Sequence, residues 1–333
     1  MGGYLWLCRE GFEPHLFEEL ATQGANPALI TRGLVASDSV PAASPAFART
    51  GFLVGKVFDH APGVLGFPDL VGTIARSLEG LVRDRVLCLQ AFTPDTAAGN
   101  RLSADAEALV KPVREMVRVG RLVDDPKAAR DAGGVLGQIC LCSPEVLVVG
   151  WVAAREALSL APGGRRRMRT GPADLSRAAA KLEEALDSFG LEPGKGESCV
   201  DLGAAPGGWT ARLLDRGARV TAVDPANLSK EIAKHPKLKH VRASAFAYAP
   251  EEPVDWLFCD MAWRPLEVAQ LLAKWGRHGW ADFLVANVKL PMRDKNGVLR
   301  RVREILAGGG WKGMTLRQLY HDRDEVTVTA RRR

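Results

Sequence analysis

The feature that most constrains the fold is a regular alternation of apolar strands and helices in the second half of the chain. The run CVDLGAAPGGWT, residues 199–210, begins with an apolar strand, passes through a turn with three glycines and enters a helix. Such alternation predicts a doubly wound, mostly parallel sheet of the α/β class. The predicted strands lie at 198–202, 219–223, 254–259 and 283–288, the helices at 175–189, 209–215, 265–275 and 298–307, and a closing antiparallel pair at 313–320 and 325–330.

The first half of the chain has a different pattern of predicted strands and helices. Apolar alternation predicts a hairpin over 135–142 and 146–152, around Ser143-Pro144-Glu145. Helical spacing predicts helices after Pro14, over 70–81 and over 103–117, the last capped by Ser103. Strands are further predicted at 4–8, 34–36, 50–58 and 85–92. Few helices against a mostly antiparallel sheet indicate an α+β region.

Proline and glycine residues that interrupt helices and strands separate the two halves of the chain. Pro162-Gly163-Gly164 and Gly171-Pro172 enclose four arginines, so we expect a basic linker over 161–175. The 333 residues then divide into a small α+β unit at 1–55, a second α+β domain at 56–160 and the α/β domain at 176–333.

Composition narrows the class of protein. The net charge of +6 is mild for this length and permits a polyanionic partner without requiring one. Six scattered cysteines form neither a CxxC pair nor a zinc pattern, so we expect no metal site and a reduced, cytoplasmic protein. Neither a leader peptide nor an apolar run long enough for a membrane span is evident, so no membrane association is expected.

The glycine turn at 203–208 follows the first strand of the parallel sheet, which is where such folds bind ligands. The dinucleotide fingerprint GxGxxG is not met, because Ala205 stands at its second glycine and Pro206 removes an N–H donor. Asp224 ends the next strand about 20 residues later, where an acid can accept both ribose hydroxyls of an adenosine group. NAD and S-adenosylmethionine both satisfy this pattern, and a helix cap is the structural alternative.

Several motifs point further. DLGAAPGGW, the acid at Asp224 and CDM at 259–261 resemble the S-adenosylmethionine-dependent RNA ribose 2′-O-methyltransferases of the FtsJ-like class. SRAAAKLEEA, NVKLPM and QLYHDRDEVTV resemble more closely the methyltransferase M family of 23S ribosomal RNA, and GYLWLCREGFEP resembles its opening. This resemblance implies a ferredoxin-like unit at 1–55, an RNA-binding THUMP domain at 56–160 and methylation of a cytidine ribose in naked or immature 23S rRNA.

The resemblance also assigns residues to the cofactor. It implies that Ser244 stands where the family carries an acid facing the adenine amino group, so this contact lacks charge assistance. We expect Asp201 to help hold the amino group of the cofactor. The predicted cofactor-binding residues are Asp201, Gly203, Ala204, Pro206, Gly207, Gly208, Trp209, Asp224, Ser244 and Asp260.

The family's catalytic Lys–Asp–Lys–Glu set corresponds to Lys181, Asp260, Lys289 and Glu325. Asp260 and Lys289 each end a predicted parallel strand, so both project at the carboxyl edge of the sheet. Glu325 begins the last strand and reaches the same edge if that strand is antiparallel. Lys289 either removes the proton of the 2′-hydroxyl, if neutral, or orients the oxygen, if protonated.

Basic residues near the linker are the candidate phosphate contacts, with a solvated linker as the alternative. They are Arg165, Arg166, Arg167, Arg169 and Arg177. Two other functions remain open at this point. One is an RNA-binding protein whose methyltransferase domain no longer reacts, against which the complete set of four charged residues argues. The other is an NAD-linked oxidoreductase.

Overall fold

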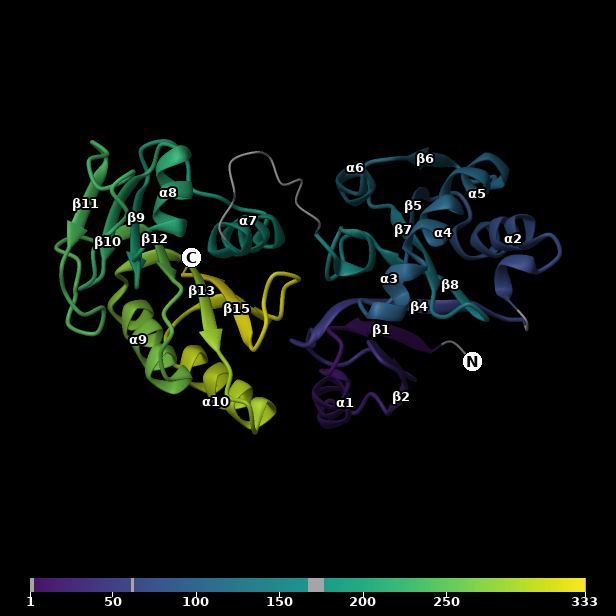
Figure 1. Cartoon of the computed structure of the whole chain (residues 1–333), viewed down its shortest axis with the longest axis horizontal. Helices are drawn as coiled ribbons and strands as arrows, with labels where there is room; N and C mark the ends of the chain where they lie inside the picture. Colours follow the sequence, from purple (N-terminus) through teal and green to yellow (C-terminus); the bar gives the residue numbers. More distant parts are fainter. Residues whose placement is uncertain (1–2, 61–62, 167–176, 333) are drawn as a thin grey trace. The chain divides into compact units, whose positions relative to one another are not determined.

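The computed structural model describes residues 3–60, 63–166 and 177–332 and separates into two units, 1–166 and 167–333. Figure 1 labels most of the elements of both. The division falls inside the predicted 161–175 linker. Residues 161–166, however, are packed into unit 1, where the short 3₁₀ turn Pro162–Gly164 (η2) contacts two strands.

Unit 1 is built on an eight-stranded sheet in the order β2-β3-β1-β4-β8-β7-β5-β6. Only the β7–β5 and β5–β6 pairs are parallel. The strands are β1 (Tyr4–Cys8), β2 (Pro27–Thr31), β3 (Leu34–Ser37), β4 (Ala48–Asp59), β5 (Val86–Phe92), β6 (Arg121–Val123), β7 (Val135–Leu141) and β8 (Val146–Ala153). The predicted hairpin is β7–β8.

A continuous strand corrects one predicted boundary. β4 runs through residues 55 and 56 and pairs with β1 on one side and β8 on the other. Residues 1–55 and 56–160 therefore share one sheet rather than forming separate sheets. The predicted boundary fell inside the predicted 50–58 strand, and that strand pairs on both of its sides, which the sequence alone does not state.

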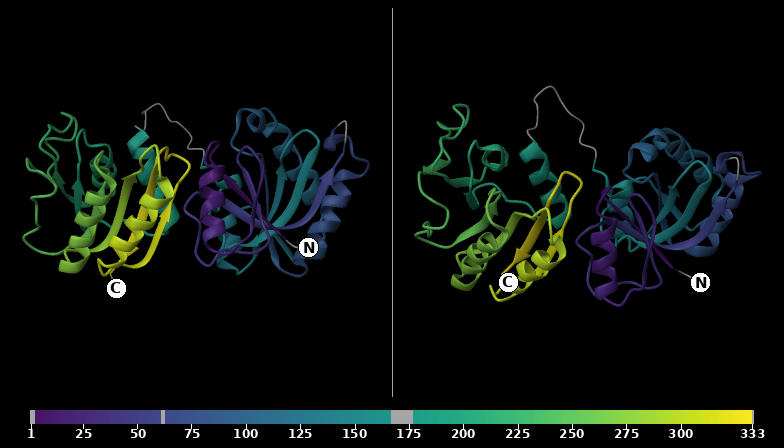
Figure 2. Two further views of the ribbon diagram at one scale, coloured as in Figure 1. Left: turned by 90° about the horizontal axis from the view of Figure 1, so that it is seen from below. Right: turned by 60° about the horizontal axis from the view of Figure 1, so that its bottom comes forward.

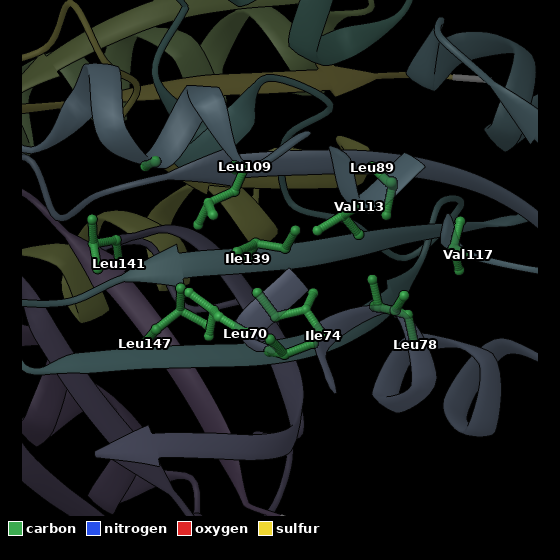
Figure 3. Packing of buried hydrophobic residues seen from close by; sticks show 14 of the residues in the cluster. Leu70, Ile74, Leu78, Leu89, Leu109, Val113, Val117, Ile139, Leu141 and Leu147 are labelled. Atoms are coloured by element: carbon green, nitrogen blue, oxygen red, sulfur yellow. The ribbon is translucent and has the colours of Figure 1, made fainter. Parts of the chain in front are cut away.

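The helices of unit 1 bury apolar faces against this sheet. Leu70, Ile74 and Leu78 of α2 pack with residues of β5, β7 and β8, as Figure 3 shows. The helices are α1 (Glu13–Thr22), α2 (Leu70–Val82), α3 (Ala97–Arg101), α4 (Ser103–Ala108), α5 (Val110–Met116) and α6 (Pro126–Asp131), with a 3₁₀ turn at Val64–Gly66. The predicted Ser103 cap is wrong: the capping hydroxyl is that of Thr96, which accepts the Gly99 N–H at the start of α3.

Unit 2 confirms the predicted α/β class. Its seven-stranded sheet has the order β11-β10-β9-β12-β13-β15-β14, and β15 alone runs antiparallel to its neighbours. The strands are β9 (Ser198–Leu202), β10 (Arg219–Val223), β11 (Leu238–Val241), β12 (Val254–Cys259), β13 (Ala281–Lys289), β14 (Lys312–Arg317) and β15 (Glu325–Arg331).

Helices cover both faces of this sheet. Leu182 and Leu186 of α7 and Leu213 of α8 pack on Trp256 and Phe258 of β12. Helices α9 and α10 lie on the opposite face of the sheet in Figure 1. Both views of Figure 2 show the β14–β15 pair, in yellow, beside the end of the chain. The helices are α7 (Arg177–Phe189), α8 (Gly208–Asp215), α9 (Pro265–His278) and α10 (Lys295–Ala307). Throughout the described ranges, no helix combines the length and apolarity that crossing a lipid bilayer requires.

Candidate active site

The turn after β9 has the backbone geometry that its glycines predict. Gly203 has φ +75° and Gly207 has φ +113°, conformations that residues with a β-carbon rarely adopt. A β-carbon on Gly203 would lie 2.4 Å from Cγ of Met261, and one on Gly207 would lie 2.2 Å from Cδ1 of Ile232. The turn thus packs closely on neighbouring residues before α8 begins at Gly208.

Two acids hold this turn in place. Asp224, at the end of β10, accepts the Ala205 N–H at 3.1 Å through one carboxylate oxygen and the Ala226 N–H at 2.8 Å through the other. Asp201 is 1% exposed and accepts the Thr210 hydroxyl at 2.7 Å, which ties β9 to α8. Burial, with the charges of Asp260 and Asp224, raises the pKa of Asp201 to about 6.

The remaining residues assigned to the cofactor surround the turn. Ala204 and Trp209 are buried, and the Trp209 indole donates to the Ala178 carbonyl of α7 at 2.7 Å. Ser244 is exposed beyond β11, and its hydroxyl accepts the Phe246 N–H at 3.3 Å. The prediction that Ser244 faces adenine stays a prediction, as does the prediction that Asp201 holds an amino group.

The four charged residues of the predicted catalytic set come together at the carboxyl edge of the sheet. Glu325 is buried, and its two carboxylate oxygens accept ion pairs from Lys181 and Lys289, one each. Lys289 Nζ also lies 3.8 Å from an Asp260 oxygen. Because β15 is antiparallel to β13, Glu325 lies directly opposite Lys289 in the register.

Electrostatics favour the charged forms of Lys289 and Glu325. Burial lowers the pKa of Lys289, but the Glu325 hydrogen bond and the charges of Glu325 and Asp260 outweigh it, and the net pKa lies above the ordinary 10.5. Burial raises the pKa of Glu325, and the two lysines reverse that effect, so its net pKa lies below 4.5. Lys289 is therefore an ammonium group at neutral pH in this structure.

A second set of contacts anchors the helix that carries Lys181. Glu184, one turn further along α7, is 7% exposed and accepts the backbone N–H groups of Tyr320 and His321, at 2.7 and 2.9 Å. On the other side of the site, Lys295 donates to the Pro291 carbonyl at 3.0 Å and pairs with Asp324 at 3.1 Å. These contacts fix both loops that flank the charged cluster.

Sequence reasoning missed Glu184 and Lys295, together with Asn287, Asp322 and Thr327. Asn287 offered a signal, because it is a polar residue inside the apolar run FLVANVK, two positions before Lys289 and so on the same face of the strand. The others depend on which strands pair, which the sequence alone does not state.

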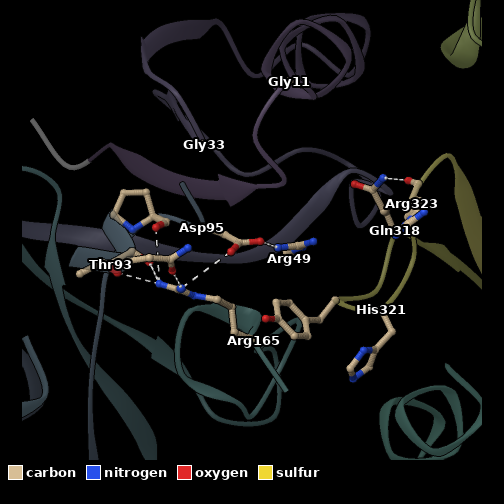
Figure 4. Close-up of polar contacts among 12 residues, drawn as sticks. Gly11, Gly33, Arg49, Thr93, Asp95, Arg165, Gln318, His321 and Arg323 are labelled. Atoms are coloured by element: carbon tan, nitrogen blue, oxygen red, sulfur yellow. Dashed lines mark hydrogen bonds and ion pairs between the residues drawn. The ribbon is translucent and has the colours of Figure 1, made fainter. Parts of the chain in front are cut away.

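Arg165, the first of the predicted phosphate contacts, is buried in the structure. Arg165 is 8% exposed and donates to the Thr93 hydroxyl at 2.7 Å and to the Asn100 side chain at 2.6 Å, inside unit 1. Asp95 lies between it and the buried Arg49, as Figure 4 shows. Arg165 is thus a structural cation and not an exposed phosphate contact. Arg165 is the first residue of the arginine run, and nothing in that run indicated that its side chain is buried.

The other predicted phosphate contacts are described only in part. Arg166 is half-buried at the end of unit 1. Arg167, Arg169 and the side chain of Arg177 lie outside the described residues. Within the described ranges, no three His, Cys, Asp or Glu side chains are grouped as metal ligands would be.

Comparison with known proteins identifies the family of the chain. The FtsJ-like methyltransferase family model matches residues 175–273, a span that includes Lys181, the glycine turn and Asp260. The chain is 33% identical, over 100% of both chains, to a "Ribosomal RNA large subunit methyltransferase M" from Xanthomonas campestris pv. campestris. Proteins of the same name from Halorhodospira halophila and Thauera aminoaromatica are 33% and 31% identical, over 99% and 98% of this chain and 97% and 95% of theirs.

The likeness extends over both units and is not confined to the methyltransferase fold. The protein is an RNA methyltransferase whose methyl donor is S-adenosylmethionine. The chain belongs to the ribosomal RNA large subunit methyltransferase M family.

Proposed function

We propose that this enzyme methylates the 2′-oxygen of a ribose, at a cytidine, in naked or immature large-subunit ribosomal RNA. The observation that carries the proposal is the buried Glu325 between Lys181 and Lys289, with Asp260 beside Lys289. This arrangement places a fixed ammonium group next to a carboxylate, which suits a hydroxyl nucleophile that must be held and deprotonated.

The charge of the cofactor turn suits S-adenosylmethionine, which supplies an electrophilic methyl group on a positively charged sulfur. Asp201, Asp224 and Asp260 lie close enough to one another that the charges of the last two raise the pKa of the first. A cationic ligand relieves this repulsion. We propose that Asp224 binds the ribose hydroxyls and that the backbone of Gly203, Gly207 and the start of α8 holds the methionine portion.

The protein side of the reaction follows from the protonation states. The Lys289 ammonium donates a hydrogen bond to the 2′-oxygen and stabilises the negative charge that develops on it. Because an ammonium group has no lone pair to accept a proton, the Asp260 carboxylate takes the hydroxyl proton. The oxygen would use a lone pair to form its bond to the methyl carbon as the carbon–sulfur bond breaks, and the electron pair of the broken bond would remain on sulfur. Glu325 and Lys181 hold Lys289 in place.

RNA capture is assigned to unit 1, as a THUMP-type module, with the reaction taking place in the cytoplasm. Support comes from exposed cations around its edge strand β6, namely Arg118, Arg121 and Lys127. Such groups bind phosphates without reading sequence. Selection of the nucleotide would then fall to the catalytic edge of unit 2.

Single-turnover methyl transfer to protein-free large-subunit rRNA tests the proposal. A 2′-O-methyl product is recognised by resistance of the neighbouring phosphodiester to alkali, which requires a free 2′-hydroxyl for cleavage. We expect Lys289→Ala to lose about 10²-fold or more in rate, while Lys234→Ala, an exposed lysine of the same unit, retains it. Methylation of a base, or equal rates for wild type and Lys289→Ala, would overturn the proposal.

A further inference from the structure

Behind the four charged residues lies a buried polar chain that the set does not include. Asn287 and Thr327 lie opposite each other on β13 and β15, two positions along each strand from the Lys289–Glu325 pair. Asn287 is fully buried, Thr327 is 2% exposed and Asp322, in the loop before β15, is also fully buried. Polar groups this deep in a sheet are costly unless they are hydrogen-bonded.

Two hydrogen bonds lead from Thr327 through Asn287 toward Asp260. The Asn287 amide nitrogen lies 3.4 Å from an Asp260 oxygen. The Thr327 hydroxyl lies 2.9 Å from the Asn287 amide oxygen and 2.9 Å from an Asp322 oxygen. If the amide were reversed, its oxygen would face the Asp260 carboxylate, and two acceptors would repel each other. The oxygens of Asp260 thus select the amide orientation.

The Thr327 hydroxyl has one proton, which determines the direction of the remaining hydrogen bond, the one to Asp322. A hydroxyl donates one hydrogen bond, and the Asn287 amide oxygen requires it. The contact between Thr327 and Asp322 then needs a proton from Asp322. Burial and the charges of Glu325 and Glu184 raise the pKa of Asp322 to about 8, although the Leu319 N–H and Thr327 hydrogen bonds lower it. A neutral carboxyl group at neutral pH supplies the missing donor.

We propose that Asn287 is a positioning residue that orients the Asp260 carboxylate for proton acceptance, and that Thr327 and Asp322 fix the direction of its amide. This inference rests on the proposed function, in which Asp260 takes the hydroxyl proton. Neither Asn287 nor Thr327 touches the substrate in this scheme. Their effect on the reaction is transmitted through the orientation of one carboxylate.

A pair of threonines on one strand provides the test. Thr327→Val removes the donor at nearly constant volume, and Thr327→Ser restores it. Thr329→Val is the matched control, because Thr329 is 4% exposed on the same strand and its hydroxyl pairs with Thr315 instead, at 2.6 Å. Measurements on the full-length protein are kcat, KM for S-adenosylmethionine and for rRNA, and thermal stability.

We expect Thr327→Val to lower kcat about tenfold or more with both KM values unchanged, and Thr327→Ser to recover most of it. Thr329→Val should keep the wild-type kcat at a similar loss of stability. Asn287→Asp, which places a second carboxyl group beside Asp260, should lower kcat at least as far. This second variant keeps the inference testable if the valine variant does not fold.

The outcomes separate the inference from the proposed function. Wild-type rates in Thr327→Val or Asn287→Asp, or equal kcat losses in the two valine variants, overturn the inference while methyl transfer by wild type persists. If wild type itself forms no 2′-O-methyl product under these conditions, the proposed function fails, and the role of Asn287 in it fails with it.

Discussion

The two lysines that share Glu325 make a quantitative prediction for Glu325→Gln. The variant keeps the shape of the side chain but removes the one negative charge between two ammonium groups, whose side chains are 11% and 35% exposed. Removing one partner of a buried ion pair costs about 3–5 kcal/mol. We expect a loss of this size in the free energy of unfolding of unit 2.

Urea denaturation measures this loss, because the fluorescence of the buried Trp209 and Trp256 reports on the core of unit 2. With a denaturant slope of about 2–3 kcal/mol per molar, the midpoint should fall by roughly 1–2.5 M. Lys181→Met should cost less, since Glu325 keeps Lys289 as a partner. The double variant should lose about 1–3 kcal/mol less than the sum of the two single losses, because it removes one of the two repelling cations.

The contribution of Glu325 to the free energy of unfolding depends on pH. The folded-state pKa of Glu325 is lowered, so its contribution is present above the ordinary value of 4.5 and disappears as pH falls through the lower folded value. Wild type and Glu325→Gln should therefore differ between about pH 5 and pH 10 and converge in acid. Losses for Lys181→Met and Glu325→Gln that add within about 0.5 kcal/mol would refute the shared-carboxylate argument.

Three further predictions follow from other parts of the chain. Because the pKa of Lys289 lies above 10.5, the single-turnover rate should not rise from about pH 7 to 9.5; a rise of about tenfold per pH unit would identify a lysine base instead. Gly203→Ala should lower the melting temperature more than Gly196→Ala, since both have positive φ but only the first places a β-carbon against Met261; equal losses would contradict this. Arg165→Met should destabilise unit 1 without changing the salt dependence of RNA binding, and a slope reduced by about one unit would show that Arg165 does contact phosphate.

Periodicity in the sequence was sufficient for most of the fold of unit 2. Apolar runs bounded by turns predicted β9, β10, β12 and β13, because these strands are buried on both faces and leave an unambiguous pattern. Short strands such as β6 and β11 escaped prediction, since three or four residues carry too little pattern to distinguish them from loops.

The site residues also differ in how far the sequence could predict them. The four charged residues could be proposed from the motifs that carry the family resemblance. Asp260 and Lys289 end apolar runs, and Glu325 begins the last strand. Arg165 was misassigned because a buried arginine and an exposed one look the same within a basic stretch. Its burial depends on Thr93 and Asn100, which are more than 60 residues away along the chain.

The reversed direction of β15 connects these observations. Six parallel strands would place only their carboxyl ends at the active edge, and a residue at the start of a strand would lie at the far side of the sheet. Because β15 runs the other way, Glu325 at its start meets Lys289 at the end of β13, and Thr327 meets Asn287 two positions further in. Side chains alternate along a strand, so a slip of one residue in this pairing would turn both Glu325 and Thr327 to the opposite face. One strand register therefore determines both the ionised cluster and the buried chain behind Asp260.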